Sequence, residues 1–300
     1  MNDLVSVIIP TYKTDFSLKM AIDSVINQTY ENIELIVVDD NNPGSKYRKS
    51  AESIMLNYKK NSKIKYVKHD KNKNGSAARN TGLKHSNGKY ICFLDDDDYF
   101  YKNKIEKQYL CILESNADGC VCFYDRDNHL NTFKVKKNYT KEILMCEKCP
   151  QTSSFMLKKE AIIKLNGFDE SYQRHQDYEF LLRFCQNYSL CVCQEALYTM
   201  DRNTSNNIPD GHKLEMIKNK FLQQFDYLID QYGLNKKNVY AKHYASVAYA
   251  YLKANDLKDF VRILKRYFNF WFISELLHKV FNFIKYKIIK TIKGRWNYDW

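Results

Sequence analysis

The chain has 300 residues, of which 44% are hydrophobic and 27% charged, and a formal net charge of +12 at neutral pH. This composition excludes a disordered or fibrous chain and is enough for a full hydrophobic core. No basic segment followed by an apolar core opens the chain, and no run of 18 apolar residues occurs in it. We therefore expect neither a signal peptide nor a transmembrane helix, and a cytoplasmic location.

Apolar runs alternate with helical patterns over the first hundred residues. They predict strands at residues 5–9, 33–38, 64–67 and 90–94, with helices near 18–26, 46–60 and 75–83. Strands that are apolar throughout are typical of a parallel sheet that is covered on both faces. The pattern therefore predicts an α/β fold with a mostly parallel sheet and helices on both sides.

Beyond residue 98 the pattern is less regular. It predicts helices at 105–113, 159–164 and 177–185, strands at 120–124, 130–135 and 154–157, and helix almost throughout from residue 211. We therefore expect an α/β domain over residues 1–210 and a C-terminal helical region over residues 211–300.

Nine cysteines lie mostly inside apolar runs, which favours reduced, buried thiols over a disulfide framework. The pairs Cys120/Cys122 and Cys191/Cys193 have the period of two that places side chains on one face of a strand. Cys146 and Cys149 form a CxxC, but the second pair of a zinc site is missing.

Four consecutive aspartates, Asp95 to Asp98, follow the apolar strand predicted at 90–94. In parallel α/β sheets the carboxyl ends of the strands hold the ligands, and carboxylates there are suited to Mg²⁺ or Mn²⁺ carrying a phosphate. The alternative is a solvated acidic loop. Asp39 and Asp40 end another predicted strand, where a simple turn in DDNNPG is the alternative.

Arg79 follows Gly75 and Ser76 near a predicted helix start. Helix N-termini favour anions, and an arginine there can donate two hydrogen bonds to a phosphate. The alternative is an ordinary surface arginine.

Six motifs occur in an order and spacing that resemble those of family 2 glycosyltransferases. They are SVIIPTYK (6–13), ELIVVDD (34–40), NGSAARNTGL (74–83), FLDDDD (93–98), NGFDE (166–170) and QDYEFLLR (176–183). The resemblance covers about residues 4–205 and is to bacterial members that build capsule, lipopolysaccharide or teichoic-acid glycans. It implies a GT-A fold, a nucleotide-sugar donor, most often UDP-linked, and Mn²⁺ or Mg²⁺ as cofactor.

The resemblance assigns roles around the donor. Asp97, the second acid of the DxD pattern, would ligate the metal, and Asp95 would contact the ribose or the metal, with Asp96 between them. For Asp98, direct ligation stays open beside a helix N-cap or a role in supporting the metal ligands.

In the nucleoside pocket that the resemblance implies, Pro10, Thr11 and Tyr12 would line the base. Asp39 and Asp40 would accept the imide N–H of uracil. Arg79 would contact a phosphate or sugar oxygen. The chain departs from the usual DDGS by carrying Asn41-Asn42-Pro43 after the two acids.

Asp177 is the general base that the resemblance implies, in a single displacement that inverts the anomeric centre. Relatives commonly carry Glu-Asp where this chain has Gln176-Asp177, so one repulsive charge is missing and the pKa of Asp177 should be lower than in that pair. The alternative for Asp177 is a plain helix cap.

Two further positions stay open. Asp169 would either orient a substrate or form a turn. The Arg-x-His of relatives is absent from Arg202-Asn203-Thr204, which leaves His212 as a distant candidate for the diphosphate site.

Residues 257–300 hold ten Lys and Arg against three acids, so they carry +7 of the total +12. Aromatic and apolar residues recur among these cations with helical spacing, as in helices that lie on an anionic membrane surface. The alternative is an amphipathic helix packed on the rest of the protein. A helix on the membrane surface would make this a peripheral protein at the inner face of the cell membrane, where we expect a glycan or polyprenyl-linked acceptor.

Two other functions compete. The basic, aromatic C-terminal region could bind nucleic acid, although no nucleic-acid motif appears and the charge lies away from the aspartates in sequence. A sugar nucleotidyltransferase would need a glycine-containing phosphate loop after the first strand, where this chain has Thr11-Tyr12-Lys13.

Overall fold

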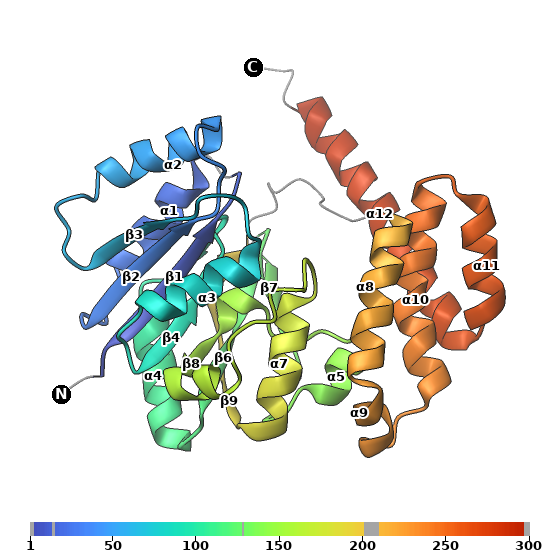
Figure 1. Cartoon of the computed structure of the whole chain (residues 1–300). Helices are drawn as coiled ribbons and strands as arrows, with labels where there is room; N and C mark the ends of the chain where they lie inside the picture. Colours follow the sequence, from blue (N-terminus) through green and yellow to red (C-terminus); the bar gives the residue numbers. More distant parts are fainter. Residues whose placement is uncertain (1–2, 14–15, 128, 201–209, 297–300) are drawn as a thin grey trace. The chain divides into compact units, whose positions relative to one another are not determined.

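The computed structural model describes residues 3–13, 16–127, 129–200 and 210–296. The chain divides into two compact units, one made of Met1–Thr140 and Lys148–Ser205, the other of Lys141–Glu147 and Asn206–Trp300. The first unit is an α/β sheet structure and the second consists of helices (Figure 1).

The first unit contains a nine-stranded mixed sheet in the order β3-β2-β1-β4-β8-β6-β9-β5, with β7 paired to β6. The strands are β1 (Val5–Thr11), β2 (Ile33–Asp39), β3 (Ile64–Lys68), β4 (Tyr90–Phe93), β5 (Asp98–Phe100), β6 (Gly119–Arg126), β7 (His129–Asn131), β8 (Met156–Lys158) and β9 (Leu190–Met200). Its helices are α1 (Ser17–Ile26), α2 (Lys46–Leu56), α3 (Gly75–His85), α4 (Lys104–Ser115), the 3-10 turn η1 (Thr152–Ser154), α6 (Lys159–Lys164) and α7 (Gln176–Asn187).

The first four strands of the chain pair in parallel, as their apolar sequences predict. The register sets Thr11 of β1 beside Asp39 of β2, and Ile8 beside Phe93 of β4. The carboxyl ends of β1, β2 and β4 therefore come to the same edge, each followed by polar residues.

Both faces of this sheet are covered, and the predicted fold class is confirmed. Val5, Val7 and Ile9 pack on one face in a core with apolar residues of α1, α2 and α4. Ile8 points the opposite way, toward α3, where a Cβ on Gly82 would come within 2.3 Å of its side chain. Only glycine therefore lets α3 lie this close to β1.

The second half of the sheet departs from the simple strand pattern. The strand predicted at 130–135 is the short β7, and β9 is an eleven-residue strand of which the sequence pattern indicates only the Cys191/Cys193 pair. The period-two prediction for the cysteines is confirmed, because Cys120 and Cys122 of β6 are the register partners of Cys191 and Cys193 of β9.

The second unit is helical, as its sequence predicts. Its helices are α5 (Thr140–Leu144), most of which lies in this unit, α8 (Gly211–Gln224), α9 (Asp226–Gln231), α10 (Lys236–Lys253), α11 (Leu257–Tyr267) and α12 (Phe270–Trp296). α10 packs against α8, α11 and α12 (Figure 1). None of the helices in the described part of the chain is long and apolar enough to cross a membrane.

A buried polar contact ties residues 141–147, which lie within the α/β domain predicted from the sequence, to this second unit. The His243 Nε2–H group donates to the Leu144 carbonyl at 3.0 Å, and Lys218 Nζ lies 3.1 Å from His243 Nδ1. Burial, followed by the positive charge of Lys218, lowers the pKa of His243 well below its usual value. A neutral imidazole with one donor and one acceptor satisfies both neighbours.

Candidate active site

Asp39, at the end of β2, is fully buried, and its carboxylate is occupied by the protein itself. It accepts the backbone and side-chain N–H groups of Asn41, each at 2.9 Å, and the Tyr66 hydroxyl, and it forms a 3.1 Å ion pair with Arg48 Nε. These contacts hold the end of β2 to the next turn and to α2 and β3. The burial of Asp39 does not support the base contact that the resemblance implies for it.

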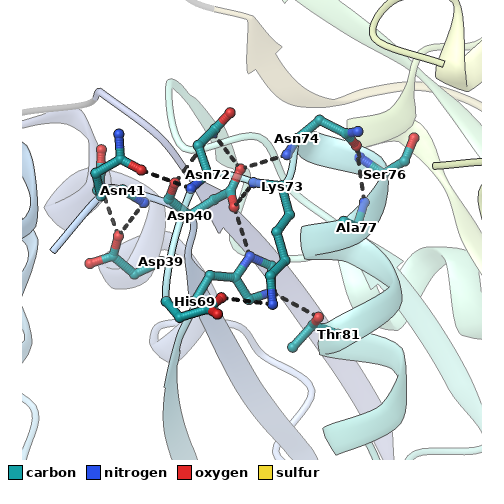
Figure 2. A network of polar contacts seen from close by, with 12 residues as sticks. Asp39, Asp40, Asn41, His69, Asn72, Lys73, Asn74, Ser76, Ala77 and Thr81 are labelled. Atoms are coloured by element: carbon teal, nitrogen blue, oxygen red, sulfur yellow. Dashed lines mark hydrogen bonds and ion pairs between the residues drawn. The ribbon is translucent and has the colours of Figure 1, made fainter. Parts of the chain in front are cut away.

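Asp40 is equally buried but joins a different network, which Figure 2 shows. Its Oδ1 accepts from His69 Nδ1 and from the backbone N–H of Lys73, both at 2.7 Å. Its Oδ2 accepts from Asn72 Nδ2 at 2.7 Å and from the Asn74 N–H at 2.9 Å. One carboxylate thus organises the whole loop between β3 and α3.

The loop continues this network into α3 (Figure 2). Asn74 is the N-cap, with a positive φ of 85°, and its Oδ1 accepts the N–H groups of Ser76 and Ala77. His69 Nε2 lies 2.9 Å from the Thr81 hydroxyl, so the ring joins Asp40 to the second turn of α3. Asp40 therefore positions the helix that carries Arg79. The sequence analysis did not identify His69, and no motif marks it.

The residues predicted to line the base follow β1. Pro10 is half-buried, Thr11 is buried and Tyr12 is 41% exposed. The Thr11 hydroxyl makes no hydrogen bond within the described residues, so a buried polar group there is available to a ligand. The Tyr12 N–H donates to Asp96 Oδ2 at 3.2 Å, which links this loop to the acidic run, Asp95 to Asp98.

Asp95 to Asp98 form a turn between β4 and β5, closed by an Asp98 N–H to Asp95 carbonyl bond of 3.0 Å. Asp98 is buried, opens β5, and accepts a 2.6 Å bond from the Ser153 hydroxyl. The helix N-cap alternative for Asp98 is wrong, since α4 begins later, at Lys104. Asp95, Asp96 and Asp97 are half-buried at the carboxyl edge of the sheet, so each is partly accessible to solvent or to a ligand.

These carboxylates suit Mn²⁺ or Mg²⁺ in chemistry. Both ions prefer oxygen ligands, and Mg²⁺ usually takes one or two carboxylates together with substrate phosphates and water. Among the described residues, no three carboxylates of the acidic run converge within 4.8 Å of one another. A cation held by Asp97 with Asp95 or Asp96 would therefore take its remaining ligands from a bound diphosphate and water.

Arg79 joins three elements at this edge. It is 8% exposed, and its Nη2 donates to Asp95 Oδ1 at 2.6 Å, while its Nη1 donates to Gln176 Oε1 at 2.9 Å. Its guanidinium carbon lies 5.5 Å from the centre of the Phe168 ring. The surface-arginine alternative is wrong, because Arg79 connects α3 to the end of β4 and the start of α7.

Asp177 is half-buried in the first turn of α7, whose N-cap position is His175, so Asp177 is not the cap. Burial raises the pKa of Asp177 above its usual value, and the nearby charge of Asp95 adds to this. The Tyr178 N–H and the Arg79 charge act in the opposite direction. The charges of Arg79 and Asp95, which form an ion pair with each other, therefore both act on Asp177. Gln176 adds no repulsive charge.

The turn before α7 is clamped to α3. Gly167 has a φ of +67°, and Asn80 bonds both backbone groups of Phe168, donating to the carbonyl at 2.9 Å and accepting the N–H at 2.8 Å. Asp169 accepts the Ser171 N–H at 2.8 Å, as a turn-forming residue does. Asn80 is a structural member of the site that the sequence analysis did not single out, although it lies inside the NGSAARNTGL motif.

Two other predicted positions do not belong to the described residues of the first unit. His212 is in the second unit, where its ring contacts the Tyr251 hydroxyl at 3.0 Å and lies 3.8 Å from Asp256 and Asp259. Arg202-Asn203-Thr204 is outside the described residues. Cys146 and Cys149 belong to different units.

The sequence and fold define the class of this protein. Residues 6–170 match the model of glycosyl transferase family 2. The chain belongs to this family, and the resemblance drawn from its motifs is confirmed.

Named relatives agree with the family. The amylovoran biosynthesis glycosyltransferase AmsB of Erwinia amylovora is 32% identical over 59% of this chain, a match that spans 62% of AmsB, which is less than two thirds of that protein. The uncharacterized glycosyltransferase MJ1057 of Methanocaldococcus jannaschii is 34% identical over 78% of this chain and 81% of its own length.

Solved structures show the same fold. S. aureus TarS 1-349, in a complex with UDP-GlcNAc, aligns with a TM-score of 0.60 over 88% of this chain and 91% of that one, at 15% identity. The complex of the same protein with UDP aligns with a TM-score of 0.58.

Proposed function

We propose that the chain is an inverting, metal-dependent glycosyltransferase that moves a sugar from a nucleotide donor, with UDP the favoured nucleotide, to a hydroxyl group. Family membership and the six motifs support the reaction class. TarS, which shares the fold, has been solved with UDP and UDP-GlcNAc, and this supports the choice of nucleotide. The acceptor would be a cell-surface glycan or a polyprenyl-linked intermediate, in line with the amylovoran biosynthesis role named for AmsB.

One observation carries the proposal: a single guanidinium contacts both Asp95 and Gln176. Asp95 begins the acidic run, and Gln176 immediately precedes Asp177. Arg79 therefore connects the carboxylates suited to the donor's diphosphate side with the carboxylate suited to the acceptor side. A transferase needs these two sets of groups at one place, because the bond to the leaving diphosphate breaks as the acceptor attacks.

The residues have distinct tasks in this mechanism. Asp177 accepts the proton of the acceptor hydroxyl, whose oxygen forms a bond to the anomeric carbon while the bond from that carbon to the diphosphate oxygen breaks. The electron pair leaves with the diphosphate, and a single displacement inverts the configuration. Arg79 contributes positive charge beside the leaving group. Mn²⁺ or Mg²⁺, when bound, would supply further positive charge to the diphosphate.

The nucleoside would lie along the carboxyl ends of β1 and β2. Pro10 and Tyr12 offer apolar and aromatic surface to a base, and the buried Thr11 hydroxyl offers a hydrogen bond. Asp40 is as buried as Asp39, and each of its oxygens already accepts two hydrogen bonds, so it would serve the pocket by holding the loop between β3 and α3. Asp39 would act only through the backbone that it holds.

We also propose that residues 257–300 hold the enzyme at the inner face of the cell membrane. Val261, Phe268 and Phe270 are exposed apolar side chains of the second unit, in the segment that carries a charge of +7. In contrast, Ile263 and Phe272 are buried. Part of the apolar stripe therefore packs inside the unit, and the rest is available to lipid.

The test of the mechanism is Asp177→Asn, assayed with a panel of nucleotide sugars. We expect turnover to fall by about 10²- to 10⁴-fold, the usual contribution of a general base, with the affinity for UDP unchanged in calorimetry. Glu114→Gln, an exposed acid on α4, is the matched control and should keep full activity. An Asp177→Asn variant that keeps most of its turnover would remove the base assignment.

The same variant has a second readout. Because the folded pKa of Asp177 is raised above its unfolded value, the carboxylate destabilises the folded chain once pH exceeds the unfolded pKa. Asp177→Asn should therefore be at least as stable as the wild type at pH 7, and its advantage should shrink as pH falls toward 4. A large loss of stability at pH 7 would show that Asp177 is structural instead.

A further inference from the structure

Three cysteine side chains from three elements of the first unit meet on the α4 side of the sheet. The Sγ atoms of Cys111, Cys120 and Cys191 all lie within 4.8 Å of one another. Cys120 and Cys191 are direct partners in the parallel pair β6/β9, and Cys111 comes from α4, which packs against both strands. All three are free thiols.

We propose that Cys111, Cys120 and Cys191 form a binding site for a thiophilic cation, with Zn²⁺ as its biological occupant. A Zn–S bond of about 2.3 Å places thiolate sulfurs about 4 Å apart, so the three side chains need to close by less than about 1 Å. Three sulfurs would leave the fourth tetrahedral position to water. Thiolates select Zn²⁺ or Cu⁺ over Mg²⁺ and Mn²⁺, so this site would not compete for the cation of the acidic run.

The surroundings of the cluster allow a cation to enter. Cys120 is buried, whereas Cys111 and Cys191 are half-buried and therefore in reach of solvent. Metal binding would release the thiol protons, as it does at other thiolate sites.

Thiols also act as small apolar groups in cores, which is the competing explanation for the cluster. The chain offers an internal comparison. Cys122 and Cys193 are register partners on the same face of the same two strands, yet their sulfurs do not join the group of three among the described residues. Packing requires no third sulfur beside either row, whereas a metal site does, and Cys111 supplies it to the row of Cys120 and Cys191.

The experiment uses the full chain, reduced with a phosphine, freed of metal by a chelator and titrated with Cd²⁺ as a spectroscopic substitute for Zn²⁺. We expect sulfur-to-metal charge-transfer absorption that saturates at one Cd²⁺ per chain and is reversed by Zn²⁺. Cys111→Ser should weaken binding by at least about tenfold, and so should Cys191→Ser. The matched control Cys193→Ser should bind as the wild type does.

The wild-type chain gives an independent measurement if a variant folds poorly. Bound Zn²⁺ should protect Cys111 and Cys191, but not Cys193, from alkylation mapped by mass spectrometry. The absence of charge-transfer absorption, an equal effect of Cys111→Ser and Cys193→Ser, or alkylation that ignores Zn²⁺ would each overturn the site. Because no readout uses sugar transfer, the result is independent of the proposed function.

Discussion

Asp39 and Asp40 are neighbours in sequence with the same side chain, but their carboxylates bind different partners. Asp39 is held by Arg48, Tyr66 and Asn41 at the end of β2, whereas Asp40 holds the loop that leads into α3. The motif resemblance assigned both of them to the base. Consecutive side chains of an extended chain point in opposite directions, so the two carboxylates face different loops. The sequence motif does not show which residues each carboxylate contacts.

We expect Asp40→Asn to lower the free energy of unfolding by about 1–3 kcal/mol. The amide NH₂ group would replace one of two oxygens that each accept two donors, so two N–H groups would lose their acceptor in a buried site. Urea denaturation measures the change. Asp70→Asn, in the same loop, is the control, because the Asp70 pair with Lys73 is exposed and should contribute little.

Equal stability of Asp40→Asn and the wild type would show that the Asp40 network does not hold the loop. The same variant should also bind UDP more weakly, because α3 and Arg79 depend on that loop. A stable variant with normal UDP affinity would contradict both expectations.

At the level of elements, the site depends on how α7 is brought to α3. The turn at 166–169 that precedes α7 is clamped by Asn80, and Arg79 of the same helix contacts Gln176. α3 thus fixes the start of α7, and with it Asp177, although about a hundred residues separate them in sequence.

Gly167→Ala tests this clamp. The residue has a φ of +67°, and an added Cβ would come within 2.4 Å of Asn80 Oδ1, so both backbone strain and a clash oppose the change. We expect a loss of stability greater than the ~1 kcal/mol typical of strain alone, together with a loss of activity.

Gly233→Ala is the matched control, because Gly233 also has a positive φ, of +64°, but open space around its Cβ position. It should show the strain cost only and keep full activity. Equal stability losses in the two variants, measured by thermal or urea unfolding, would mean that the contact with Asn80 is unimportant.

At the scale of the whole molecule, charge and apolar exposure are distributed unevenly. The acidic run belongs to the first unit, whereas residues 257–300 of the second unit carry more than half of the net positive charge. Exposed aromatic side chains accompany that charge at the start of α12 and just before it. Lys242 lies 4.8 Å from the centre of the Trp271 ring, so a cation and an aromatic group are already paired there.

We expect the protein to bind vesicles that contain anionic lipid, and the double variant Phe268→Ser with Phe270→Ser to bind them at least about tenfold more weakly. Burying one phenylalanine contributes about 1.5–3 kcal/mol, and 1.4 kcal/mol corresponds to a factor of ten. Co-sedimentation with vesicles measures the partition. Tyr227→Ser, which removes an exposed aromatic residue from α9, is the control.

Binding to an oligonucleotide of equal charge density, measured at the same salt concentration, distinguishes a membrane partner from a nucleic-acid partner. Preference for the vesicles, with sensitivity to the two phenylalanines, supports the membrane proposal. Preference for the oligonucleotide, with no effect of the double variant, would favour the nucleic-acid alternative.

Much of the first unit could be predicted from local pattern alone. The four N-terminal strands, α3 and α7 follow from apolar runs, helix periodicity and turn residues, because each forms from residues that are close in sequence. The pairing of β5 with β9 could not be predicted in this way, since it joins Asp98–Phe100 to residues near 200. The sequence therefore suggested a cap for Asp98 where the structure has a strand.

The sequence by itself determined the family, the α/β class and the residue types at the carboxyl edge of the sheet, because motifs and periodicity are local properties of the chain. Only the tertiary structure decided that Asp39 is enclosed, that Asp40 holds the α3 loop, that Arg79 joins Asp95 to Gln176, and that Cys111 meets Cys120 and Cys191. Each of these facts depends on side chains that are distant in sequence or on the direction in which a side chain points. Burial and pairing, which set the charge state and the task of a group, exist only once the chain has packed.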